Sequence, residues 1–228
     1  MAQEDKSWTA KGVDAAEIVA RVSAIDRFIA AMIDIILHFG LRKKEATMLA
    51  PHWAVVPASM VPIANPTAEF YLMVIDGTKG GRLRFAPIDT EAKLRALERA
   101  QQVAVHRYSH LGRPGHSLKQ ILDRFSYVMR KVGVTKDQLK VTIHGLRHQF
   151  ANDLYFALTD IPSPVRGGVP TDLQRHVGAC LEIARQLGHE RTQISSAYLG
   201  QSGVMRSKRS NASANTTSAR ESEGANST

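Results

Sequence analysis

The sequence is poor in cysteine and in acidic residues, and it has no long uninterrupted apolar run. Its one cysteine, Cys180, excludes an internal disulfide framework and suits a reducing compartment. The most apolar stretch, residues 28–41, is interrupted by Asp34 and His38. It is also shorter than the roughly 20 residues that span a bilayer. The polar, acidic N-terminus is not a secretory signal. We therefore expect a cytoplasmic protein that has no membrane partner.

The shortage of acidic residues leaves a strongly basic chain. Lysine and arginine number 30 against 21 aspartates and glutamates, which gives a formal net charge of +9 and a pI near 9.9. Such an excess favours a polyanionic partner, most often a nucleic acid, although good solubility alone is the simpler interpretation. The 228 residues, 43% of them hydrophobic, suffice for one good-sized domain or two small ones.

Composition and periodicity divide the chain into three parts. Residues 1–12 are polar, and we expect a flexible N-terminus. Residues 13–200 carry regular apolar patterns and form the domain, whereas residues 201–228 are rich in Ser, Asn, Thr and Ala, which predicts a disordered tail. Within the domain, apolar residues recur at helical spacing from Ile18 to Leu37, and Gly40 is a plausible helix stop.

The remaining patterns predict a mixture of helices and a small amount of sheet. Residues 69–75 and 82–88 are β-prone and flank a glycine-rich turn, which predicts a hairpin. An irregular strand is expected near residues 55–63. Further helices are expected at residues 43–50, 92–105, 118–132, 145–158, 171–187 and 192–199.

Two segments near the C-terminal end carry the residues of greatest chemical interest. His144 and Arg147 lie in residues 141–151, and His189 and Tyr198 lie in residues 187–199. An arginine fork can hold two phosphate oxygens, a tyrosine hydroxyl can attack phosphorus, and histidines can move the protons. The combination suits phosphoryl transfer to a phenol.

In this order the two segments resemble the tyrosine recombinase (phage integrase) family. The resemblance requires an upstream arginine after a Gly-Leu helix end and a lysine on a hairpin between the two, and Arg42 and Lys79 meet both requirements. It implies an α+β, mostly helical catalytic domain with a small antiparallel sheet. The catalytic set that it implies is Arg42, Lys79, His144, Arg147, His189 and Tyr198.

The resemblance also implies a function and a mechanism. The chain would be a site-specific DNA recombinase that cuts and rejoins double-stranded DNA through a covalent 3′-phosphotyrosyl intermediate, as a multimer assembled on DNA. Arg42 and Arg147 would clamp the phosphate, Lys79 would protonate the leaving 5′-oxygen, and His144 would exchange a proton near the nucleophile. His189 would donate to the phosphate. No metal, ATP or other cofactor is required, because the covalent link keeps the phosphodiester energy.

Other basic residues are candidates for contacts with the DNA backbone. They are Lys43, Lys44, Arg82, Arg84, Arg107 and Arg113. We interpret His148, next to Arg147, as a residue that faces outward or packs behind the catalytic residues without taking part in the reaction. Solvent exposure is the simpler interpretation for each of the lysines and arginines, and core packing is the simpler one for Tyr198.

Two departures from the family pattern leave other functions open. Positions 147 and 189 are 42 apart, which indicates an insertion near residues 161–177, and only about a dozen residues precede the first expected helix. Without an N-terminal clamp domain we expect weak, salt-sensitive DNA binding. The alternatives are a truncated or accessory DNA-binding protein without cleavage activity, a topoisomerase-like relaxing enzyme, and, least favoured, a metal-dependent hydrolase that uses several of the histidines.

Overall fold

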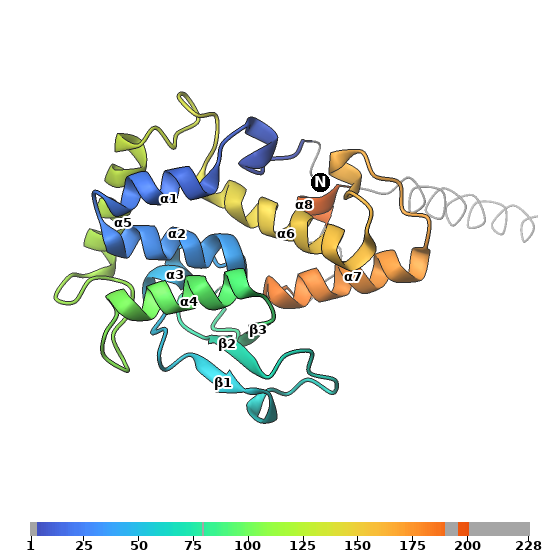
Figure 1. The fold of residues 1–228 in the computed structure, drawn as a ribbon, viewed down its shortest axis with the longest axis horizontal. Coiled ribbons are helices and arrows are strands. Elements are labelled where there is room, and N and C mark those ends of the chain that lie inside the picture. The colour runs from blue at the N-terminus through green and yellow to red at the C-terminus, as the bar shows by residue number, and fades with distance from the viewer. Residues whose placement is uncertain (1–3, 79, 190–195, 201–228) are drawn as a thin grey trace, which may run out of the picture.

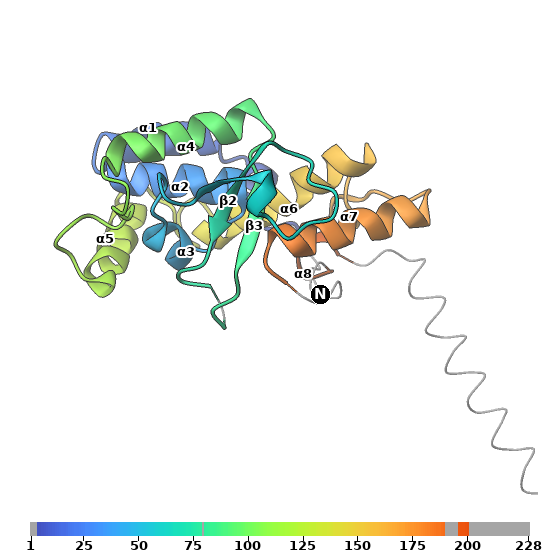
Figure 2. The ribbon, with the colours of Figure 1, turned by 90° about the horizontal axis from the view of Figure 1, so that it is seen from below.

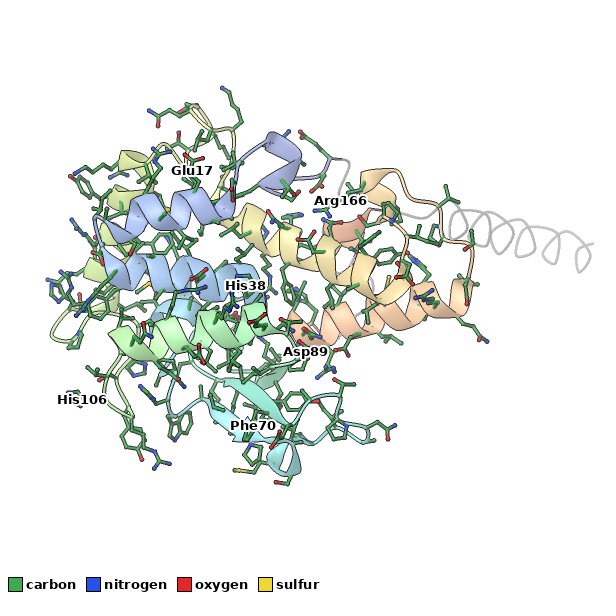
Figure 3. All side chains as sticks on the ribbon, in the orientation of Figure 1. Glu17, His38, Phe70, Asp89, His106 and Arg166 are labelled. Carbon is green, nitrogen blue, oxygen red and sulfur yellow. The ribbon has the colours of Figure 1, made fainter. Side chains whose placement is uncertain are left out.

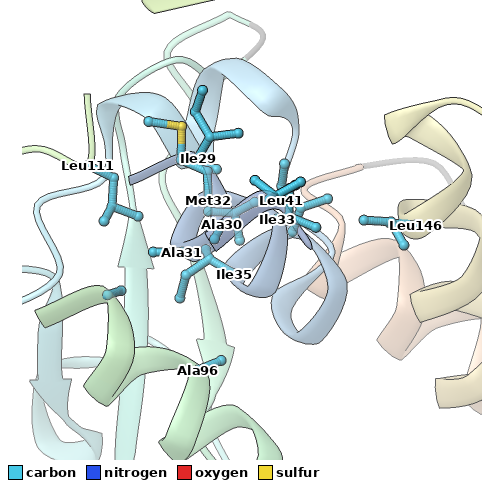
Figure 4. Close-up of a cluster of buried hydrophobic side chains, with 14 of the residues drawn as sticks. Ile29, Ala30, Ala31, Met32, Ile33, Ile35, Leu41, Ala96, Leu111 and Leu146 are labelled. Atoms are coloured by element: carbon cyan, nitrogen blue, oxygen red, sulfur yellow. The ribbon is translucent and has the colours of Figure 1, made fainter. Parts of the chain in front are cut away.

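The fold is built around one apolar helix, α2 (Arg27–Phe39), in which nine of 13 residues are buried. A helix that is apolar on every side must be enclosed by other elements. Helices α1 (Ala15–Ser23), α4 (Glu91–Val103) and α6 (Ile143–Thr159) pack on it, as the computed structural model shows for residues 4–78, 80–189 and 196–200 (Figure 1). Figure 4 shows the apolar side chains of α2 at the centre of the largest core cluster. No helix in these described ranges is long and apolar enough to cross a membrane.

A small sheet lies against one side of the helices and confirms the predicted α+β, mostly helical class. Its strands β1 (Val55–Pro57), β2 (Phe70–Val74) and β3 (Arg84–Pro87) are antiparallel in the order β1-β2-β3. Leu72 of β2 is paired with Val55 on one side and with Ala86 on the other. The hairpin expected from residues 69–88 is therefore present. The other helical elements are α3 (Lys43–Met48), α5 (Leu118–Lys131), α7 (Leu173–Gln186), α8 (Ser196–Leu199), and the 3-10 turns η1 (Thr9–Lys11), η2 (Ala58–Met60) and η3 (Pro164–Arg166).

The uninterrupted helix that the apolar spacing between Ile18 and Leu37 suggested is in fact two helices. The chain breaks between α1 and α2, and Asp26 begins the second helix with extended backbone angles. Its carboxylate accepts from the amides of Phe28 (3.2 Å) and Ile29 (3.4 Å). Periodicity alone missed the break because both helices present apolar faces to the same core.

Replacing Asp26 with alanine is expected to lower the free energy of unfolding by about 1–2 kcal/mol, because two amides at the start of α2 lose their acceptor. The change also removes the partner of Arg124, whose Nε lies 3.0 Å from the carboxylate. Urea unfolding measures the loss. Asp26→Asn keeps an acceptor oxygen and should retain most of the stability, so equal losses in the two variants would contradict the capping role.

The N-terminal segment differs from the loose chain expected for residues 1–12. Trp8 is fully buried, and its indole Nε1 donates to the carbonyl of Thr142 (2.8 Å) at the start of α6. The amide of Thr9 donates to Gln149 on the same helix (3.3 Å). Trp8 is therefore the apolar anchor of residues 4–12, whose remaining side chains are mostly small or polar. The tail expected at residues 201–228 lies outside the described residues.

Candidate functional site

Arg147 is the buried centre of the candidate site and is 1% exposed. From α6, its Nη1 donates to the carbonyl of Gly40 at the end of α2. Nη2 donates to the carbonyl of Leu187 (2.6 Å) and lies 3.2 Å from Nε2 of His189. Nε donates to the hydroxyl of Tyr198 (3.1 Å) on α8. One guanidinium thus connects four parts of the chain. The two predicted C-terminal segments, residues 141–151 and 187–199, meet at this group.

Gly40 makes this convergence possible. It ends α2 in the left-handed conformation (φ 62°), which glycine adopts without a steric penalty. A Cβ atom at this position would lie 2.5 Å from Phe150 Cδ1 and 2.8 Å from Leu187 Cδ2. The helix stop expected from sequence is therefore also the point at which α2 approaches α6 closely enough for Arg147 to reach its carbonyl.

Three histidines surround the ring of Tyr198, which is 6% exposed. The ring centroid of His148 lies 4.8 Å from that of Tyr198, and those of His144 and His189 lie 5.9 Å and 6.0 Å away. The His144 and His148 rings meet edge to face at 5.0 Å. The phenol is therefore held between a cation and several groups that can exchange protons.

A buried carboxylate, Glu45, lies beneath the arginines. Its oxygens accept from Nη1 of Arg42 (2.6 Å) and from the backbone amide of Arg42 (2.7 Å), and it forms an ion pair with Arg84. Arg84 donates in addition to the carbonyl of Gln186 at the end of α7. Glu45 is fully buried while the Arg42 side chain remains 28% exposed. The carboxylate therefore orients Arg42 from the interior, and part of the Arg42 side chain stays at the surface.

Burial and nearby cations lower the pKa values of the histidines. Burial, followed by the charge of Arg147, lowers the pKa of His189 to about 4 and also lowers that of His144. Burial, followed by His144, lowers the pKa of His148 to about 4. Burial also lowers the pKa of Arg147, against the opposing effect of Tyr198. At neutral pH the cluster therefore consists of neutral imidazoles around one guanidinium.

The lowered pKa values predict a loss of stability in mild acid. In the unfolded chain a histidine titrates near its ordinary pKa of 6.5, whereas the folded pKa values of His148 and His189 are about 4. Between these pH values the unfolded state binds more protons, so the stability present above pH 6.5 falls as the pH drops toward 4. We expect a loss of about 2 kcal/mol at about pH 5 from the buried His148 and a smaller loss from the half-buried His189, measured by urea unfolding.

A variant pair tests the assignment of this acid sensitivity. His148→Gln should reduce the stability difference between neutral and mildly acidic pH, whereas His106→Gln, at the exposed histidine labelled in Figure 3, should leave it unchanged. Equal behaviour of the two variants would show that other groups cause the loss.

Of the predicted catalytic residues, the structure places His144, Arg147, His189 and Tyr198 around one point. Arg42 lies close enough for its charge to lower the pKa of both His144 and His189. Lys79 lies outside the described residues. The turn between β2 and β3, on either side of this position, projects on the same side of the molecule as α3 and α8 (Figure 2).

Arg84, predicted to contact DNA, is instead 5% exposed and paired with Glu45. Strand β3 directs this side chain inward, toward the buried carboxylate of Glu45. The other predicted DNA contacts remain at least partly exposed. They are Lys43, Lys44, Arg82, Arg107 and Arg113.

Two residues of the cluster, His148 and Glu45, were not among the predicted catalytic residues, although His148 was expected either to face outward or to support the site. His148 is 5% exposed against Tyr198, although its spacing of four from His144 could have indicated a shared helix face. Glu45 stands three residues after Arg42, the spacing of a capping box, which the structure shows. The helix expected at residues 145–158 begins at Ile143 in the structure, so that Arg147 lies one turn in.

Comparison with known proteins adds a match to a protein family. A family model described as Integrase matches residues 7–153, more than half of the chain, and this range includes Arg42, Lys79, His144 and Arg147. No curated protein matches the chain.

Three solved structures with similarity to the chain are recombinases. The crystal structure of XerA recombinase shares 18% identity with a TM-score of 0.47, over 87% of this chain and 63% of that one. XerH site-specific recombinase bound to difH substrate in a pre-cleavage complex shares 15% identity with a TM-score of 0.43, over 86% of this chain and 51% of that one. The post-cleavage complex of XerH with palindromic difH substrate shares 16% identity with a TM-score of 0.42, over 86% of this chain and 50% of that one. The chain thus matches between half and 63% of the length of these proteins. On the strength of the family match over residues 7–153, the chain belongs to the integrase family, the tyrosine recombinases that its motifs resemble.

Proposed function

We propose that this chain carries the catalytic domain, residues 13–200, of a site-specific DNA recombinase that uses Tyr198 as its nucleophile. The observation that carries the proposal is the hydroxyl of Tyr198, held 3.1 Å from Arg147 Nε inside a ring of three histidines. A phenol is a useful nucleophile only where nearby groups accept its proton and stabilise the charge that develops on phosphorus. This cluster contains both kinds of group.

In the proposed reaction the Tyr198 oxygen attacks the scissile phosphorus and the bond from phosphorus to the 5′-oxygen breaks. The phenolic proton passes to His144, and Lys79 protonates the departing 5′-oxygen. The product is a 3′-phosphotyrosyl link and a free 5′-hydroxyl. Attack by a 5′-hydroxyl of another strand reverses each step, so the number of phosphoester bonds is conserved and no cofactor enters the balance.

Arg42 and Arg147 are proposed to hold the two non-bridging phosphate oxygens, and His189 to donate to one of them. Arg42 is the more accessible of the two arginines, so we expect the phosphate to bind Arg42 before Arg147. All three nitrogens of the Arg147 guanidinium already donate within the protein. When the phenol of Tyr198 moves to attack, Arg147 Nε loses its acceptor and donates to the phosphate instead. Binding of the phosphate is thereby coupled to release of the nucleophile.

Double-stranded DNA is the proposed partner, bound by several protomers together. The basic residues that remain exposed on α3 and on the loop before α5 would supply contacts to the backbone. The formal net charge of +9 favours the same polyanionic partner. Cytoplasmic location and assembly as a multimer on DNA belong to the same proposal.

A covalent-trapping assay tests the proposal. Nicked duplexes that contain a recombination site of this chain are incubated with the chain and with Tyr198→Phe, and a protein–DNA band that resists denaturation is measured. A band from the parent chain that is absent from Tyr198→Phe supports the proposed nucleophile. DNA binding without a band from either protein would reject the cleavage mechanism and favour an accessory DNA-binding role. A band from both would assign the nucleophile to another residue.

A further inference from the structure

The segment formed by residues 4–12 lies beside the catalytic cluster and not away from it. Figure 1 shows it running along the start of α6 toward α8. The carbonyl oxygen of Lys6 packs against Gly145, where a Cβ atom would come within 2.5 Å of it. Gly145 directly follows His144, so the backbone of Lys6 touches the turn of α6 that presents this histidine.

The segment is held in place at two points. Trp8 is fully buried against α6, as described above. Asp5 accepts from Nε of Arg166 (2.9 Å), and the same guanidinium donates to Asp153 on α6 (2.7 Å). Arg166, labelled in Figure 3, belongs to η3, within the insertion inferred between Arg147 and His189. The insertion therefore braces the N-terminal segment against α6.

Among the charged side chains of this segment, Lys6 has no counterpart. Glu4 and Lys11 form an ion pair with each other, and Asp5 is paired with Arg166. Lys6 is exposed, and no hydrogen bond or ion pair joins its ammonium group to any described residue. After burial and other nearby charges, Lys6 contributes to lowering the pKa of His144 and His148. Its charge therefore acts on the cluster.

We propose that Lys6 is a DNA-phosphate contact of the candidate site, positioned by Trp8 and by the Asp5–Arg166 ion pair. The proposal rests on the proposed function, since it takes DNA as the partner of the same site. An unpaired ammonium on a braced backbone can neutralise a phosphate next to the scissile one without first leaving another partner. The insertion is then a support for the DNA-binding surface, and not an obstruction of the site.

The salt dependence of DNA binding tests this role, because each phosphate contact adds about 0.9 to the slope of log K against log salt concentration. Fluorescence anisotropy with a labelled duplex of random sequence measures the slope for the parent chain, Lys6→Gln and Lys11→Gln. The two variants remove the same charge from the same segment. We expect Lys6→Gln to reduce the slope by about 0.9 and Lys11→Gln to leave it nearly unchanged. Equal slopes for the two variants would overturn the proposal.

A second comparison tests the bracing. In an Asp5→Asn background the segment loses its ion pair, so adding Lys6→Gln should change the slope by less than it does in the parent chain. An undiminished effect of Lys6→Gln would show that the Asp5–Arg166 pair does not position the lysine. Absence of any DNA binding by the folded parent chain would count against the proposed function itself, whereas binding with an unchanged Lys6→Gln slope would count against this inference alone.

Discussion

Arg147→Ala is expected to abolish formation of the covalent complex, with a loss of about 10³-fold or more in rate. The guanidinium donates to the phenol of Tyr198 and lies within reach of His189 Nε2, so its removal takes away the cation beside the nucleophile. The variant also leaves the carbonyls of Gly40 and Leu187 buried without their donor. We expect a loss of about 2–4 kcal/mol in the free energy of unfolding.

A conservative variant separates catalysis from folding. Arg147→Lys keeps the charge but cannot donate in three directions at once, so we expect a folded protein whose rate of covalent complex formation falls by about 10²-fold. Arg95→Ala is the matched control, because this guanidinium lies on the exposed face of α4 and pairs only with Glu91 one turn away among the ion pairs of the described residues. Rates are compared after thermal unfolding has confirmed that each variant is folded. Near-parental activity of Arg147→Lys would contradict the proposed clamp.

Glu45→Ala is expected to cost about 3–5 kcal/mol in the free energy of unfolding, because removal of one partner leaves buried charge uncompensated. Burial already lowers the pKa of Arg84 to about 10, even though the carboxylate opposes the effect. Burial by itself would raise the pKa of Glu45, yet Arg84 and the amide of Arg42 bring it below its ordinary value. The same substitution frees Arg42 from its orientation, so phosphate binding weakens as well.

Two comparisons test the assignment to buried charge. Glu17→Ala disrupts an exposed pair with Arg21 (3.9 Å) and should change the free energy of unfolding by less than about 1 kcal/mol. Combining Glu45→Leu with Arg84→Met removes both charges and should recover much of the stability lost by Glu45→Ala. Guanidinium chloride unfolding measures all three. A loss below about 1 kcal/mol for Glu45→Ala would mean that water reaches this ion cluster.

Most of the secondary structure could be predicted from local patterns. The hairpin follows from two β-prone segments around a glycine-rich turn, and the end of α2 follows from Gly40. The break at Asp26 was missed because the helix cap is a local signal inside an otherwise regular apolar pattern. Capping of a helix by an aspartate depends on its backbone angles, and these depend on how α1 folds back onto α2.

The order and identity of the motifs, and hence the family, could be read from the sequence alone, because these are properties of spacing along the chain. Which charges are buried depends instead on the tertiary structure. Arg147 donates to a carbonyl 107 positions away, and Arg84 to one that is 102 positions away. Trp8 reaches across 134 positions to anchor the segment that carries Lys6. Partners so distant in sequence leave no periodic signal, and the burial of a charged group depends on all the segments that enclose it.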